Sequence, residues 1–389
     1  MKKIITLGGA MLDLFIQQEA LPCSHAQQGN KNFLLLEIGK KLEINSIEKQ
    51  SGGGATNAAV SFSRLGLQTK IIGKVGADCE GDFIIAELKK NGVNTDHLLR
   101  STTDMTGLSI IIPCPAGERT VLAYRGANIS LQGKEIPTNL FDTSDALYIT
   151  SLTGSSAALL LPITRHAKKQ GCIVATNPGT SQLVRGTQTL LESLPNIDIF
   201  ILNSFEAQEC MRALTKQLPS NKTAEISVSE KNKKRNIPAY EKAHALASHA
   251  ASELTQKNLP ALLRKSSEYH TPDFGLRNFF AQILSHGPQV VAVTNGAEGV
   301  YVAQGDTIYF HPGLATNVVS TIGAGDAFGS CFVASLLQEK SVPEALIRGI
   351  TNASSVIGSV GAKTGLLAPD ELEKRMNSVG LQQLKRFTR

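Results

Sequence analysis

The segment STIGAGDAFGSCFVASLLQ, residues 320–338, carries the pattern on which the fold assignment depends. Gly323 and Gly325 precede an apolar run with helical spacing, so the segment predicts the first turn of a helix. The N–H groups of such a turn lack intrahelical partners and attract anions. Asp326 nevertheless places a carboxylate in the same turn. An acid beside an anion-binding turn requires a chemical explanation.

A carboxylate is useful at this position when a neutral hydroxyl lies between it and a phosphate group. Asp326 can then accept the hydroxyl proton as the oxygen attacks phosphorus. The amides of Gly323, Ala324 and Gly325 can stabilise the charge of the phosphoryl group during transfer. A helix start in which Asp326 is only a first-turn acid explains the segment equally well. On this segment alone, both interpretations stay open.

The same glycines do not fit two common nucleotide-binding motifs. A dinucleotide-binding fold requires GxGxxG after an early strand, whereas Gly329 comes one position late and the segment lies far along the chain. No GxxxxGK[ST] sequence occurs in the chain, which excludes a Walker P-loop.

Along most of the chain, apolar strand-like runs alternate with amphipathic helical runs. Residues 2–9 and 69–78 predict strands, and residues 55–66 between them predict a helix that Gly66 ends. Residues 106–128 predict a β-hairpin with its turn at Pro115-Ala116-Gly117. This alternation predicts an α/β fold built on a largely parallel sheet.

One interval departs from this alternation of strands and helices. Glu206 and Thr294 are 88 positions apart, whereas a strand–helix–strand crossover takes about 30 residues. We predict a partly flexible surface insertion at about 215–280, with an Ala-rich helical candidate at 239–256. Residues 216–270 carry a net charge of +5, out of +6 for the whole chain. A solvated surface explains this local excess better than nucleic-acid binding.

Composition limits the class of protein. Hydrophobic residues make up 42% and charged residues 19% of the chain, as in ordinary soluble domains. The six cysteines are scattered without a CxxC pair, which indicates a reducing, cytoplasmic location rather than a zinc or disulfide framework. The start of the chain predicts a strand rather than a signal peptide. No run reaches the roughly 18 apolar residues of a membrane span.

A second motif, GGGATNAAVSFSRLG at 52–66, completes a pair of signatures. Because it contains both the 52–66 motif and the 320–338 segment, the chain resembles the ribokinase-like (PfkB) family of carbohydrate kinases. The resemblance covers nearly the whole chain except residues 215–280. The resemblance implies one kinase domain over residues 1–389, with a three-layer α/β/α core. It also implies a small β lid formed by residues of about 14–50 and 103–128.

The resemblance also implies roles for individual residues. Asp13, at the end of the first predicted strand, is expected to bind the sugar together with Gly53, Gly54, Asn57 and Asn128. The acid binds hydroxyls, the glycines permit close approach, and Asn57 both donates and accepts. The expected nucleotide-binding residues are Asn203, Thr294, Gly296, Gly299 and Asn352. Glu206 is expected to act on Mg²⁺ through water, as suits a cation that keeps its waters. Taken singly, the glycine run is more often an ordinary turn, and Asn203 with Glu206 is more often a helix cap.

Two departures from the family pattern narrow the expected activity. Many relatives hold a monovalent cation through an aspartate where this chain has Ser320, and through a hydroxyl where it has Ile322. These differences argue against K⁺ activation. Ribokinases proper carry an acidic residue where this chain has Ser151 and Leu152, which argues against ribose.

The leading hypothesis is an ATP- and Mg²⁺-dependent kinase that phosphorylates a hydroxyl of a sugar or sugar derivative. Two alternatives remain: a nucleoside kinase of the adenosine type on the same fold, and a non-catalytic regulator that binds sugar or nucleotide. The chain contains no Trp and few aromatic residues to build a base pocket. The basic run Lys231–Arg235 is expected to be a solvated loop, so the partners are the sugar and ATP, without nucleic acid or membrane. A homodimer that pairs the lids is a further hypothesis.

Overall fold

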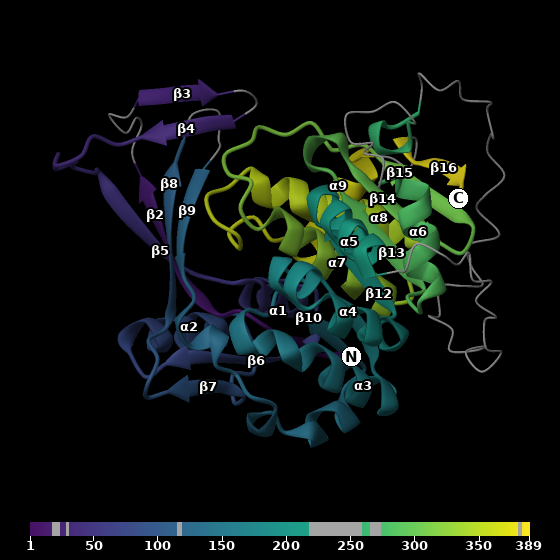
Figure 1. Ribbon diagram of the computed structural model, residues 1–389, viewed down its shortest axis with the longest axis horizontal. Coiled ribbons are helices and arrows are strands. Elements are labelled where there is room, and N and C mark those ends of the chain that lie inside the picture. Colours follow the sequence, from purple (N-terminus) through teal and green to yellow (C-terminus); the bar gives the residue numbers. More distant parts are fainter. Residues whose placement is uncertain (18–23, 29–30, 115–118, 218–258, 265–273, 380–382) are drawn as a thin grey trace.

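The computed structural model describes residues 1–389 except 18–23, 29–30, 115–118, 218–258, 265–273 and 380–382 (Figure 1). Within the described residues, the main element is a ten-stranded sheet of order β16-β15-β14-β13-β12-β11-β10-β1-β6-β7. The strands from β13 to β7 are parallel, and β14, β15 and β16 are antiparallel. Their bounds are β1 (Lys3–Leu7), β6 (Gln68–Gly76), β7 (Leu98–Ser101), β10 (Ala146–Ile149), β11 (Ile173–Thr176), β12 (Ile199–Asn203), β13 (Val290–Thr294), β14 (Val300–Gln304), β15 (Thr307–His311) and β16 (Lys385–Thr388).

Helices cover both faces of this sheet. Side chains alternate along each strand, so Ile5 and Leu7 of β1 enter one core cluster and Ile4 enters the other. The first cluster lies under α3 (Leu160–Lys169), α4 (Thr187–Ser193), α5 (Ser204–Gln217) and α6 (Leu276–Ser285). The second lies under α1 (Gly54–Arg64), α7 (Ala324–Leu337), α8 (Val342–Ile357) and α9 (Pro369–Val379), and α2 (Cys79–Lys90) packs beside α1. The predicted three-layer α/β/α core is confirmed.

A smaller sheet, which we call the lid, stands beside this core (Figure 1). Its strands lie in the order β5-β2-β8-β9, with bounds β2 (Met11–Gln17), β5 (Ser46–Gly52), β8 (Gly107–Pro113) and β9 (Arg119–Tyr124). A two-stranded ribbon of β3 (Ser24–Gln28) and β4 (Lys31–Leu35) extends from it. The turn predicted at 115–117 falls outside the described residues. Asp13 lies within lid strand β2, not at the end of the first strand as expected, because a new strand begins at Met11.

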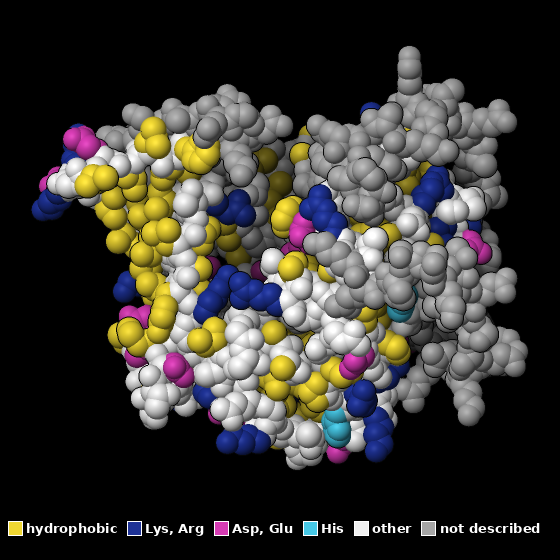
Figure 2. All heavy atoms as spheres, viewed as in Figure 1, with side chains coloured by type: hydrophobic (Ala, Val, Ile, Leu, Met, Phe, Trp, Pro, Cys, Tyr) yellow, Lys and Arg dark blue, Asp and Glu magenta, His cyan; other side chains and the backbone are white. Residues whose placement is uncertain are grey.

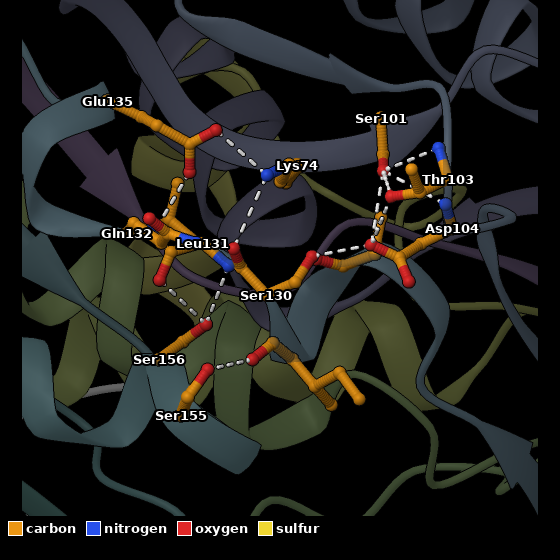
Figure 3. Close-up of polar contacts among 12 residues, drawn as sticks. Lys74, Ser101, Thr103, Asp104, Ser130, Leu131, Gln132, Glu135, Ser155 and Ser156 are labelled. Atoms are coloured by element: carbon orange, nitrogen blue, oxygen red, sulfur yellow. Dashed lines mark hydrogen bonds and ion pairs between the residues drawn. The ribbon is translucent and has the colours of Figure 1, made fainter.

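Side-chain hydrogen bonds fix the points where the lid joins the core. Asn128, after β9, accepts from the Ala10 N–H at 2.8 Å and donates to the carbonyls of Ala10 and Arg125, each at 2.9 Å. The same junction continues in Figure 3, where Ser130 donates to Asp104 in the segment between β7 and β8. These bonds tie three of the connections between the lid and the core to one another.

The interval of the predicted insertion includes core residues. Its first residues belong to α5 and its last to α6. Leu262, Leu263 and Phe274 are buried in the first core cluster. The Ala-rich helical candidate at 239–256 lies outside the described residues, so the prediction of a helix there stays a prediction. Among the helices that the structure describes, none combines the length and the apolar character that a bilayer crossing requires.

Candidate active site

The glycine-rich turn forms the start of helix α7, as the sequence predicts. Gly323 caps the helix with a left-handed φ of 78°, and its carbonyl accepts from the Ala327 N–H at 2.8 Å. A Cβ at this position would lie 2.6 Å from Ala362 Cα, so glycine is required. At Gly325, a Cβ would meet no atom within 4 Å, so the space beside the turn is open. The turn therefore offers unpaired N–H groups to an open space, which suits a phosphate.

The two sequence motifs meet at one hydrogen bond. Asn57 of α1 donates from Nδ2 to Oδ2 of Asp326 at 2.8 Å, although the residues are 269 positions apart. Burial raises the pKa of Asp326, while the bond from Asn57 and the charge of Lys363 lower it. Asn57 Oδ1 is buried and has no hydrogen-bond partner among the described residues. The pair thus presents a carboxylate, which can accept a proton from a hydroxyl group, and an amide oxygen, which can accept a hydrogen bond from one.

Asp13 adds a second carboxylate from the lid. It lies opposite Ser109 of β8, and a Cβ at Gly52 would come within 2.6 Å of Asp13 Oδ1. Burial raises the pKa of Asp13 to about 6, against the opposing effects of the hydrogen bond with Ser109 and the charge of Lys363. Asp326 is one of the charges that raise this pKa, which places the two acids within electrostatic reach of each other. The predicted acid and base therefore converge.

Lys363 occupies the same region and was not predicted from the sequence. Its side chain is buried, lies 3.9 Å from Glu87 Oε1, and donates to Ser51 and to Thr56 Oγ1. Burial lowers its pKa to about 8, and the charges of Glu87, Asp13 and Asp326 oppose this shift. The flanking letters GAKTG give no sign of burial, because lysine in a glycine-containing loop is usually exposed.

Asn203 and Glu206 form a reciprocal cap at the start of α5. The Asn203 N–H donates to Glu206 Oε2 at 2.9 Å, and the Glu206 N–H donates to Asn203 Oδ1 at 2.8 Å. Burial raises the pKa of Glu206, and the charge of Asp326 adds to the effect. Within the described residues, no group of three or more His, Cys, Asp or Glu could hold a metal. A magnesium role for Glu206 stays a prediction. A single carboxylate is compatible with Mg²⁺, because this ion retains several water ligands.

The remaining nucleotide residues separate into two groups. Thr294 ends β13 beside Asn203 of β12, and Gly296 and Gly299 form the left-handed positions of the following turn. Asn352 is instead buried in α8, where it donates to the Ala327 carbonyl and accepts from the Leu367 N–H, each at 3.0 Å. Its amide is engaged by the backbone of the core. The amide of Asn128 is similarly engaged by the lid junction, so the ligand roles of these two asparagines stay predictions.

The lid contacts the glycine-rich loop directly. Arg119 of β9 donates from its guanidinium to Thr321 Oγ1, two residues before Gly323. The face drawn in Figure 2 is hollowed between the lid and the core. The carboxylates and the anion-binding turn thus lie where the lid strands return to the core, as expected for a site that closes over its substrate.

A three-layer α/β/α core, a β lid, and an acid beside an anion-binding helix start define the class of lidded small-molecule kinases. The family model described as pfkB family carbohydrate kinase matches residues 1–238 and 266–369. The chain therefore belongs to this family and is a carbohydrate kinase. The match leaves out residues 239–265, which fall inside the predicted insertion, and residues 370–389.

Named relatives agree with this assignment. An uncharacterized sugar kinase of Archaeoglobus fulgidus is 25% identical over 79% of this chain and 98% of its own length. An ATP-dependent ribose-1-phosphate kinase of Halopiger xanaduensis is 24% identical over 94% of this chain and 95% of its own. The structure of Arabidopsis thaliana ribokinase complexed with ribose and ATP aligns with a TM-score of 0.68 at 17% identity, over 96% of this chain and 98% of that one. The structural likeness confirms the fold.

Proposed function

We propose that this carbohydrate kinase transfers the terminal phosphoryl group of ATP to a hydroxyl of a sugar or sugar derivative, with Asp326 as the general base. The observation that carries the proposal is the hydrogen bond between Asn57 and Asp326. It joins the motif expected to bind the sugar to the motif expected to bind the phosphate. A structural first-turn acid has no need of a buried asparagine whose amide oxygen has no hydrogen-bond partner among the described residues.

The chemistry follows from the positions of the side chains. Asp13 and Asn57 Oδ1 accept hydrogen bonds from sugar hydroxyls and so orient one hydroxyl toward Asp326. As the oxygen of that hydroxyl bonds to phosphorus, its proton passes to Asp326 and the bond from phosphorus to the ADP oxygen breaks. The amides at Gly323–Gly325 stabilise the negative charge on the phosphoryl oxygens. The raised pKa of Asp326 helps it to hold the proton that it receives.

The residues present fit a nucleotide and a magnesium ion. The open space beside Gly325 accommodates a phosphate close to the backbone. Glu206 uses Oε2 in its cap and retains Oε1 as a hard ligand, directly or through water. When bound, Mg²⁺ supplies positive charge to the phosphate oxygens. The contact of Arg119 with Thr321 brings the lid over this turn, and closure there excludes water that would otherwise accept the phosphoryl group.

Replacement of Asp326 by asparagine tests the assignment. We expect Asp326→Asn to bind ATP and sugar with near-normal affinity by calorimetry and to lose about 10²–10⁴-fold in kcat. A panel of sugars, sugar phosphates and nucleosides in an ADP-release assay identifies the acceptor class. Turnover of the variant at the wild-type rate with the best acceptor would falsify the role of Asp326.

We also propose that two lids pair in a homodimer. Ile47, Leu122 and Tyr124 of lid strands β5 and β9 are exposed apolar side chains on one face of the lid sheet, and Figure 2 shows hydrophobic side chains gathered over the lid. Both β5 and β9 are edge strands of the lid sheet. In a two-fold dimer, the same patch of both subunits forms the interface, so a second lid would cover the apolar face and the open edges of the first.

A further inference from the structure

Lys363 is a buried cation that the proposed mechanism does not use. It lies in the loop between α8 and α9, and its residue is only 4% exposed. Burying an ammonium group is costly unless hydrogen bonds and opposite charges compensate for the lost water. A lysine that is retained at such a cost in a candidate site calls for a specific role.

The contacts of Lys363 join three elements. Its Nζ donates to the carbonyl and hydroxyl of Ser51 at the end of lid strand β5, and to Thr56 Oγ1 of α1 at 3.2 Å. Glu87 of α2 lies 3.9 Å away and accepts from the Ser51 N–H at 2.8 Å. Lys363 therefore fixes the short connection at Gly52–Gly53 through which the lid returns to the helix that carries Asn57.

The charged side chains around Lys363 include the carboxylates of the candidate active site. Glu87 of α2, Asp13 of β2 and Asp326 of α7 all raise its pKa, and Arg64 of α1 lowers it. Conversely, Lys363 lowers the pKa of both Asp13 and Asp326, which burial raises. One ammonium group thus faces three carboxylates, and two of them are the predicted sugar-binding acid and the predicted base.

We propose that Lys363 is a positioning residue of this kinase, which locks lid strand β5 to helix α1 and supplies the positive charge beside the carboxylates of Asp13 and Asp326. The inference rests on the proposed function, because it assigns Lys363 to the same site. Lys363 acts through Ser51, Thr56 and the carboxylates. It is not a group that touches the reacting atoms.

The pH dependence of the reaction distinguishes this role from simple packing. Removing the cation raises the pKa of Asp326 and Asp13, because an opposite charge stabilises the ionised form. In Lys363→Met, the acidic limb of kcat/KM is therefore expected to move to higher pH by about one unit.

Two further variants make the test decisive. Lys363→Met leaves Glu87 without its buried cation, so the double variant with Glu87→Gln restores the wild-type net charge of the region and should recover the thermal stability. Its acidic limb should remain shifted, because Asp326 still lacks the nearby positive charge. Lys90→Met removes the same charge from an exposed position on α2 and is expected to keep the wild-type profile.

The outcomes separate the two proposals. A shifted acidic limb in the folded double variant supports the role of Lys363. A wild-type pH profile in either Lys363 variant, measured alongside an inactive Asp326→Asn, overturns the role of Lys363 and leaves the proposed function intact. If Asp326→Asn itself retains turnover, the proposed function fails first. Recovery of both stability and wild-type kcat/KM in the double variant would show that Lys363 only balances the charge of Glu87.

Discussion

Replacing Gly323 by alanine is expected to weaken both the fold and catalysis. A left-handed φ of 78° costs a residue with a Cβ about 1–2 kcal/mol. The new Cβ would lie 2.6 Å from Ala362 Cα, whereas carbon atoms pack at about 3.5–4.0 Å. The turn or its neighbour must therefore move by roughly 1 Å, and overpacking of this kind costs about 1–3 kcal/mol. Together, the free energy of unfolding should fall by about 2–5 kcal/mol.

The same displacement moves the amides that stabilise the phosphoryl group. A misplacement of about 1 Å can reduce turnover by roughly 10²-fold. Denaturant unfolding and an ADP-release assay measure the two effects separately. Gly325→Ala is the matched control: its φ is not left-handed and its Cβ meets no atom within 4 Å, so the fold should be kept or slightly stabilised. Its methyl group occupies the space reserved for phosphate, so kcat should still fall. Equal loss of stability in both variants would refute this reasoning.

Three further predictions follow from other contacts. Burial raises the pKa of Asp326 in the folded protein, so the ionised carboxylate destabilises the fold at any pH above the pKa of this group in the unfolded chain. Asp326→Asn should therefore melt at or above the wild-type temperature at pH 7–8. Near pH 3, where Asp326 is protonated in both states, the difference in melting temperature should vanish. Asn352→Ala should lose about 1–3 kcal/mol of stability through two buried backbone groups while the KM for ATP stays unchanged; a raised KM without loss of stability would instead place Asn352 at the nucleotide. Leu122→Asp should convert the proposed dimer to monomers in light scattering with little change in the melting temperature, and an unaltered mass would reject lid pairing through this surface.

The parts of the site that the sequence predicts are those fixed by local chemistry. Gly323 needs a left-handed backbone, and the apolar residues after Asp326 need a helix, so the anion-binding turn can be identified within a few residues. The motif around Asn57 is equally local. Their meeting in space follows from the fold, because α1 and α7 pack side by side in the second core cluster.

The parts that the sequence could not predict depend on partners far along the chain. The sequence around Asn128 and Asn352 does not show that backbone groups of other elements bind their side-chain amides. In the sequence, Lys363 resembles an exposed lysine, because its contacts with Glu87 and Ser51 depend on the fold. Asp13 was assigned to the end of a strand, because nothing in its neighbours shows that a second strand starts two residues earlier.

The central claim is that one carboxylate and one set of amides act on the same phosphoryl group. A crystal structure with a non-hydrolysable ATP analogue and the best acceptor sugar tests it most directly. The account predicts the terminal phosphate against the amides of Gly323–Gly325 and one sugar hydroxyl within hydrogen-bond distance of the Asp326 carboxylate. Nucleotide bound away from this turn, or Asp326 facing away from the acceptor hydroxyl, would contradict it.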